Sequence, residues 1–125
     1  MNLKAILSLS VIAILISFIP ETKVECLKIT CLNPRDTVSQ TIGELKTYFL
    51  VESLGDTLTG FDIRSSCGCE YPVWNKEMKI FPNHPDTVII VSLLKGYNGR
   101  WQKETTITVN NCTEVFYTGP WFVTE

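Results

Sequence analysis

The sequence predicts an all-β domain, built as an antiparallel β-sandwich, behind a short apolar N-terminal segment. Three observations lead to this prediction. Past position 24 the apolar residues show no helical period, they gather in short segments rich in branched and aromatic side chains, and turn residues separate the segments about every 8–12 residues. About six or seven strands of this kind are typical of a sandwich of the immunoglobulin type.

Residues 1–24 are predicted to be a signal peptide or a helical membrane anchor, and residues 25–125 the immunoglobulin-like domain. Lys4 gives the segment a positive start, residues 5–19 are apolar apart from three serines, and Pro20 ends the run. As a helix this run reaches about 22 Å, short of the roughly 30 Å hydrocarbon core of a bilayer, which favours export over a stable span. Lipid attachment at Cys26 is disfavoured, because small residues do not precede it.

The first half of the domain contains three clear strand patterns. Residues 45–52 are rich in aromatic and branched side chains, and residues 54–56 turn the chain. Residues 57–65 form the next expected strand, with Phe61 and Ile63 on one face. Residues 78–81 form a short strand that the proline-containing run 82–85 ends.

The second half is predicted to be a series of strands joined by tight turns. Residues 87–94 are nearly all apolar, as in a strand buried on both faces, and residues 96–99 form a turn. Residues 103–109 alternate between apolar and polar side chains, and two asparagines turn the chain again. A last strand covers 114–123, with an interruption at Gly119 and Pro120, whereas residues 25–38 hold either an edge strand or an irregular arm.

The charge balance and the motif content argue against several classes of function. The formal net charge is −2, and no basic stripe is present to neutralise phosphates, so nucleic acid is not an expected partner. We find no glycine-rich phosphate loop and no paired catalytic carboxylates, and the single histidine, His84, lies among turn residues. The sequence therefore predicts a protein that is not an enzyme and that binds no small-molecule cofactor.

All five cysteines are candidates for disulfide bonds in an exported chain: Cys26, Cys31, Cys67, Cys69 and Cys112. Five choices of the unpaired cysteine times three connectivities give fifteen arrangements of two bridges, and the sequence does not select one. In an extended strand Cys67 and Cys69 would lie about 6.6 Å apart on one face, too far for a bond. Either Gly68 bends the chain through a positive φ and the pair closes, or both thiols face a third group.

Three roles remain open for the Cys67 and Cys69 pair. The pair is structural, or it is a thiolate site for copper(I) or zinc, or it is a thiol–disulfide redox centre. A metal site would draw on Cys67 and Cys69, with Cys112 or His84 as a further ligand, since soft thiolates suit both ions. A redox centre usually has two residues between its cysteines and a basic neighbour that lowers a thiol pKa, and neither is present here.

The motifs around this pair resemble the bacterial domain of unknown function family 1573, an exported immunoglobulin-like domain. The matching pieces are LGDTL at 54–58, IRSSCGC at 63–69, KIFP at 79–82, DTVIIV at 86–91, GRW at 99–101 and ITVNN at 107–111, and they cover roughly residues 43–119. The chain departs from the family pattern at 82–85, where the family has Pro-Gly, and its other three cysteines are additions. The resemblance implies a fold and an exported location, and it brings no activity.

Two further groups of residues are candidate sites. Aromatic residues in turns or at strand ends could form a binding patch: Tyr71, Trp74, Tyr97 and Trp101. Three Asp-Thr-aliphatic triplets resemble the acceptor of a bacterial O-glycosylation system at Thr37, Thr57 and Thr87, although Asp also ends turns and Thr begins strands.

Together these features favour a non-enzymatic, exported binding or structural module of the bacterial cell envelope, periplasmic, envelope-associated or secreted. Its partner would be a protein of the envelope, and it would meet the membrane only through residues 1–24 if they stay uncleaved. Exposed strand edges could take another strand by β-addition. The alternative is a copper, zinc or redox thiol protein centred on Cys67 and Cys69.

Overall fold

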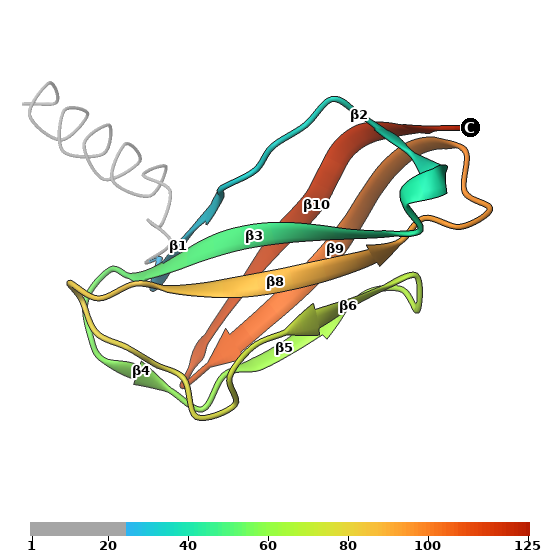
Figure 1. The fold of residues 1–125 in the computed structure, drawn as a ribbon. Coiled ribbons are helices and arrows are strands. Elements are labelled where there is room, and N and C mark those ends of the chain that lie inside the picture. The colour runs from blue at the N-terminus through green and yellow to red at the C-terminus, as the bar shows by residue number, and fades with distance from the viewer. Residues whose placement is uncertain (1–24) are drawn as a thin grey trace, which may run out of the picture.

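The computed structural model describes residues 25–125, and the expected signal peptide or anchor at 1–24 lies outside the described residues. The described part is mostly β-structure, with two four-stranded sheets and a core between them (Figure 1). This confirms the all-β prediction. Within residues 25–125 no helix is long and apolar enough to cross a bilayer.

The first sheet is antiparallel throughout. Its strands are, in spatial order, β1 (Leu27–Cys31), β3 (Glu44–Ser53), β8 (Asp86–Leu93) and β6 (Glu70–Val73). Along β3, buried and exposed residues alternate, so every second side chain enters the core. β1 lies at the edge of this sheet. Of the two expectations for residues 25–38, the edge strand is therefore confirmed.

The second sheet is mixed, which corrects the prediction of purely antiparallel pairing. Its strands are, in order, β2 (Thr37–Ser39), β10 (Cys112–Thr124), β9 (Gly99–Val109) and β5 (Asp62–Ser65). The short β2 runs parallel to the end of β10, whereas β10–β9 and β9–β5 are antiparallel. A 3-10 turn (Gln40–Ile42) leads from β2 into β3, and β4 (Leu58–Thr59) pairs with β7 (Lys79–Ile80) apart from both sheets.

The predicted set of strands is wrong in two places. The expected strand 57–65 is two strands, because the chain breaks at Gly60, where φ is +72°. Sequence reasoning also missed β6, in which Pro72 has no N–H to donate. Proline is tolerated there because β6 is the edge of its sheet and needs a partner on one side only.

The nearly all-apolar β8 is fully buried on one face only. Val88, Ile90 and Ser92 are completely buried toward the core. On the other face Val91 is also buried, Ile89 is half-buried and Leu93 is 38% exposed. The expectation of burial on both faces is therefore met at Val91 and wrong at Leu93. β8 is central in its sheet, which explains the apolar run without a second covering layer.

The core joins the two sheets through facing apolar side chains. The ring of Phe49 on β3 lies 4.7 Å from the ring of Phe116 on β10, centroid to centroid, so the two sheets are in direct contact. At one end of the core, a second cluster contains the buried indoles of Trp101 and Trp121. Trp101 of that cluster contacts Glu70, the buried residue at the centre of the candidate site described below.

A disulfide between Cys26 and Cys112 joins the chain just before β1 to the first residue of β10. The two cysteines are 86 positions apart, so the bond removes much conformational freedom from the unfolded chain. The other disulfide, Cys67 to Cys69, spans two positions. Cys31 is the one cysteine left as a thiol, and it is half-buried.

The two bridges should differ widely in their contribution to stability. Replacing both Cys26 and Cys112 by Ser is expected to lower the free energy of unfolding by about 4–5 kcal/mol, and replacing both Cys67 and Cys69 by about 1–2 kcal/mol, because the entropy removed grows with loop length. Urea unfolding of both double variants measures the difference. Equal losses would contradict this account of the bridges.

Gly119 is expected to be intolerant of any side chain. Its φ is +104°, and a Cβ there would overlap the carbonyl oxygen of Trp101 on the neighbouring strand. We expect Gly119→Ala to lower the free energy of unfolding by at least about 2 kcal/mol. Gly55→Ala, at an open position without positive φ, is the matched control and should change it by less than about 0.5 kcal/mol. Similar melting temperatures for the two variants would contradict this expectation.

Candidate functional site

The Cys-Gly-Cys segment forms the turn between β5 and β6. Cys67 and Cys69 are bonded to each other across a Cα–Cα distance of 5.2 Å, so the pair closes. The chain bends without the positive φ expected of Gly68, which is absent from the glycines with left-handed backbone. The turn thus links the edge strands of the two sheets.

Backbone hydrogen bonds hold this turn at both ends. The N–H of Ser66 donates to the carbonyl oxygen of Glu104 at 2.9 Å, and the N–H of Glu104 donates to the Ser66 hydroxyl oxygen at 3.3 Å. At the other end, the N–H of Leu93 donates to the carbonyl oxygen of Cys69 at 2.8 Å. The turn is therefore attached to β9 and β8 by contacts that do not involve sulfur.

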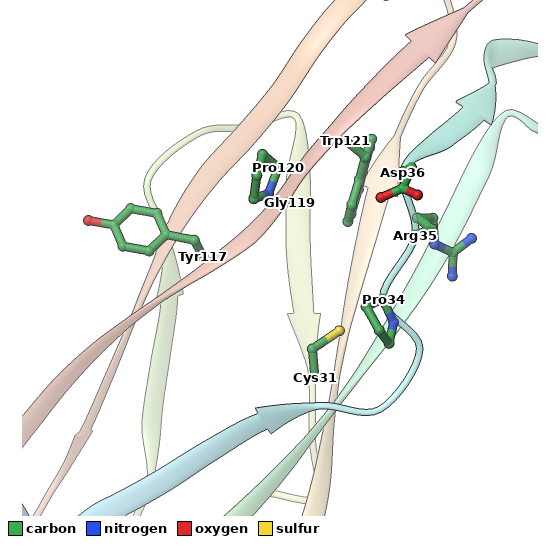
Figure 2. A pocket seen from close by; sticks show the side chains of 8 residues that line it. All are labelled: Cys31, Pro34, Arg35, Asp36, Tyr117, Gly119, Pro120 and Trp121. Atoms are coloured by element: carbon green, nitrogen blue, oxygen red, sulfur yellow. The ribbon is translucent and has the colours of Figure 1, made fainter.

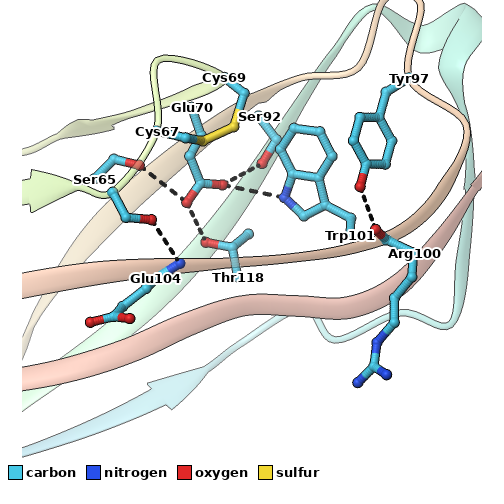
Figure 3. Close-up of a disulfide and its surroundings, with 11 residues drawn as sticks. Ser65, Cys67, Cys69, Glu70, Ser92, Tyr97, Arg100, Trp101, Glu104 and Thr118 are labelled. Atoms are coloured by element: carbon cyan, nitrogen blue, oxygen red, sulfur yellow. Dashed lines mark hydrogen bonds between the residues drawn. A yellow bond between two sulfur atoms is a disulfide. The ribbon is translucent and has the colours of Figure 1, made fainter.

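Glu70, the first residue of β6, is a buried carboxylate and only 2% exposed. One of its oxygens accepts hydrogen bonds from the hydroxyls of Ser65 at 3.4 Å and Thr118 at 3.2 Å. The other accepts from the Ser92 hydroxyl at 3.2 Å and from the indole N–H of Trp101 at 3.4 Å (Figure 3). Four strands of both sheets thus converge on one carboxyl group.

Burial raises the pKa of the Glu70 carboxyl above its ordinary value, and the four hydrogen bonds lower it by less. No cation pairs with it, since the one ion pair within residues 25–125 joins Arg64 and Asp62 at the surface. The Lys103 ammonium lies 5.3 Å from the centre of the Trp101 ring, whose indole N–H donates to Glu70. Glu70 is therefore a buried carboxyl group that holds its proton to a higher pH than an exposed glutamate does.

Sequence reasoning missed Glu70. It follows Cys69 in a stretch that has no alternation of apolar residues, so nothing marked it as the start of a strand. The only available signal was its position directly after the cysteine pair. Burial of a glutamate depends on donors from β5, β8, β9 and β10, and these meet only in the folded chain.

The structure does not bring the four metal candidates together. Cys67 and Cys69 are bonded to each other, Cys112 is bonded to Cys26, and His84 lies on an exposed loop. Within residues 25–125 the one group with ligand spacing is Cys26, Cys112 and Glu114, and both of its sulfurs belong to a disulfide. With the bridges closed, these residues offer no thiolate to copper or zinc.

The four aromatic candidates do not form one surface patch. Trp101 is fully buried, and Tyr97 packs against it with ring centroids 4.7 Å apart. Trp74 packs against the other core cluster, and only Tyr71 is well exposed, at 44%. Three of the four rings therefore close the core.

The three glycosylation candidates lie in different settings. Thr37 is exposed in β2 and Thr57 is exposed in the turn before β4. Thr87 is half-buried in β8, and its N–H is held by the Asp86 carboxylate at 2.7 Å. Thr37 and Thr57 are thus the accessible acceptors.

One side of β10 is unpaired over most of its length. On one side, β10 pairs with β9 from Cys112 to Thr118 and again from Trp121 to Val123. On the other side, only Phe122, Val123 and Thr124 pair with a strand, which is β2. Within the described part of the chain, residues 112–118 therefore present free backbone N–H and C=O groups at a sheet edge.

A cavity of about 450 Å³ lies beside the end of this edge (Figure 2). The β1–β2 connection contributes Arg35 and Asp36 to its wall, β1 contributes Cys31, and β10 contributes Tyr117 and Trp121. The guanidinium of Arg35 lies 5.9 Å from the centre of the Trp121 ring. Both apolar side chains and the charged side chains of Arg35 and Asp36 therefore line the cavity.

Glu70 should make folding stability depend on pH in a characteristic direction. Its pKa is raised in the folded state, so the stability it contributes is full below the unfolded-state pKa of about 4.3 and is lost as pH rises through the folded-state pKa. Relative to Glu70→Gln, the wild-type protein should lose about 1.4 kcal/mol for each unit by which the pKa is raised. Urea unfolding of both proteins from pH 4 to pH 8 measures this loss, and a constant difference or a gain at high pH would contradict the assignment.

No family model matches the chain, and no curated protein matches it either. The comparisons therefore assign no family. The resemblance of the Cys-Gly-Cys region to the domain of unknown function family 1573 has no support beyond the motifs themselves.

Proposed function

We propose that this protein is a non-enzymatic binding module, exported to the bacterial cell envelope, that takes an extended segment of a protein partner along the free edge of β10. The single observation that carries the proposal is the unpaired side of residues 112–118, whose other side pairs with β9. A strand with free N–H and C=O groups is the template that β-strand addition requires. Main-chain hydrogen bonds would supply affinity there.

The order of strands supports an immunoglobulin-like type for this module. The orders β1-β3-β8-β6 and β2-β10-β9-β5 correspond to the two sheets of the immunoglobulin constant type, with β2 as an additional strand beside the last one. The resemblance to family 1573 implies the same fold. This type of domain commonly serves as a scaffold for binding at its edges and loops.

Two closed disulfides support export. Disulfides persist in oxidising compartments and are rare in the reducing cytosol, and four of the five cysteines here are in bridges. The apolar run at residues 5–19 supplies the expected signal for export. The proposed location is therefore the periplasm or the cell envelope.

Side chains along the edge support specificity for an apolar strand. Val115 and Tyr117 point outward and are 45% and 50% exposed, whereas Phe116 and Thr118 between and after them are buried. An added strand would place alternate apolar side chains over this outer pair. One further side chain could enter the cavity between Arg35 and Trp121.

A lysine at the edge should block strand addition. Random heptapeptides displayed on phage are selected for binding to the wild-type domain, and the affinity of the best peptide is measured by calorimetry. We expect Val115→Lys to weaken binding at least about tenfold, because an edge charge opposes a second strand. Thr106→Lys is the matched control, since Thr106 is paired directly with Val115 but lies on β9, which has strands on both sides.

The same peptide should perturb the amide signals of residues 112–118 in an NMR titration. Equal affinity for both lysine variants and the wild type would overturn the proposal. So would perturbations confined to β6, the edge on the opposite side of the sheets.

A further inference from the structure

The Cys67–Cys69 bridge contributes little to the stability of this fold. It closes a loop with one residue between its cysteines, so it removes little entropy from the unfolded chain. The turn that carries it is already held by hydrogen bonds from Glu104 and Leu93. The bridge could therefore open and close while the two sheets stay folded.

The two sulfurs of this bridge have different surroundings. Cys69 packs against the buried cluster that contains Trp101, whereas Cys67 is not among the residues packed on either core cluster. Both are half-exposed in the turn. A thiolate from solution would therefore reach Cys67 first, and Cys69 would be the leaving sulfur.

A titratable residue follows the leaving sulfur directly in the chain and shares Trp101 with it. Glu70 follows Cys69 directly, and its carboxyl group accepts the indole N–H of the same Trp101 against which Cys69 packs. Figure 3 shows the bridge and the carboxyl group together at the start of β6. A buried carboxyl without a cation is costly as a purely structural element. A glutamine could meet the same donors, because the Ser65 and Thr118 hydroxyls can also accept.

We propose that the Cys67–Cys69 bridge is a thiol–disulfide exchange site, in which Glu70 delivers a proton to the leaving sulfur of Cys69 and takes it back in the reverse reaction, when the disulfide form of the substrate oxidises the two thiols. The substrate is a dithiol, such as a small molecule with two thiols or a peptide with two cysteines. This exchange consumes one bridge for each substrate dithiol, so it is not a catalytic activity, and it is separate from strand addition, because the bridge joins β5 and β6 at the sheet edges opposite β10 and β1.

The exchange balances as two successive displacements. A substrate thiolate attacks the Cys67 sulfur, the Cys67–Cys69 bond breaks with its electron pair on Cys69, and the Glu70 carboxylic acid protonates that thiolate. The second substrate thiolate then attacks the substrate sulfur of the mixed disulfide and releases Cys67, which takes a proton from solvent. The substrate dithiol is oxidised to a disulfide by two electrons, and the bridge is reduced to two thiols.

The side chains around Glu70 determine how its protonation affects the rate of bridge opening at different pH values. β5, β8 and β10 present hydroxyl groups, from Ser65, Ser92 and Thr118. β9 presents the Trp101 indole, with the Lys103 ammonium beyond it and the Glu104 backbone bonded to the turn. Burial raises the Glu70 pKa, so the carboxyl holds its proton to a higher pH than an exposed one.

The test measures the reduction of each bridge in a Cys31→Ser background by dithiothreitol under native conditions. Alkylation and mass spectrometry count the thiols that appear on each cysteine, and circular dichroism reports folding. We expect the Cys67–Cys69 bridge to open at least about tenfold faster than the Cys26–Cys112 bridge, with the β-spectrum unchanged. A Cys67–Cys69 bridge that opens only when the protein unfolds would overturn the proposal.

Glu70→Gln separates proton transfer from a structural role. Dividing the wild-type rate by the Gln variant's rate at each pH cancels the ionisation of the attacking thiol. This ratio should be about tenfold or more at low pH, where Glu70 is protonated, and should fall as pH rises through its pKa. The matched control is Glu114→Gln, since the Glu114 carboxylate lies beside the Cys26–Cys112 bridge and is less buried. A ratio for Glu70 that is independent of pH would overturn the assignment of Glu70.

Discussion

β10 lies against β9 for most of its length, and this single ladder positions both candidate sites. It sets the Trp101 indole and the Thr118 hydroxyl so that both reach Glu70. It also brings Gly119 so close to the Trp101 backbone that no larger residue fits. Because β2 covers only the last few residues of β10, the same ladder leaves the other side of residues 112–118 open. A buried polar site and an exposed edge thus follow from one pairing.

The two sites lie on opposite sides of the molecule and use different chemistry. The edge of β10 offers backbone hydrogen bonds and two outward apolar side chains, so its energetics would be those of sheet formation. The β5–β6 turn offers a disulfide and a carboxyl group that burial keeps protonated to a higher pH. Cys26–Cys112, and not the short bridge, supplies most of the covalent restraint on the fold. The two proposals are therefore compatible: strand addition on one side and disulfide exchange on the other would not interfere.

The sequence predicts the β-class and most turns, because alternation and turn residues are local signals. The turn at Asn110 is an example: its φ is +53°, a conformation that asparagine tolerates. Strand pairing is not local. The parallel pairing of β2 with β10 and the choice of the Cys26–Cys112 bridge therefore could not be predicted from the sequence. Glu70 was missed for the same reason, since its donors come from four strands far apart in sequence. The four predicted aromatic residues do not form one surface patch, because Trp101 is fully buried although it follows a turn in the sequence.

Amide hydrogen exchange, followed residue by residue, tests the free edge of β10 most directly. In β9, residues 105–108 have strands on both sides, so all four of their amides should be protected. In residues 112–118, protected and rapidly exchanging amides should alternate, because every second N–H points away from β9. Uniform protection of residues 112–118 at the level of β9 would show that another segment covers this edge, and it would contradict the proposed mode of binding.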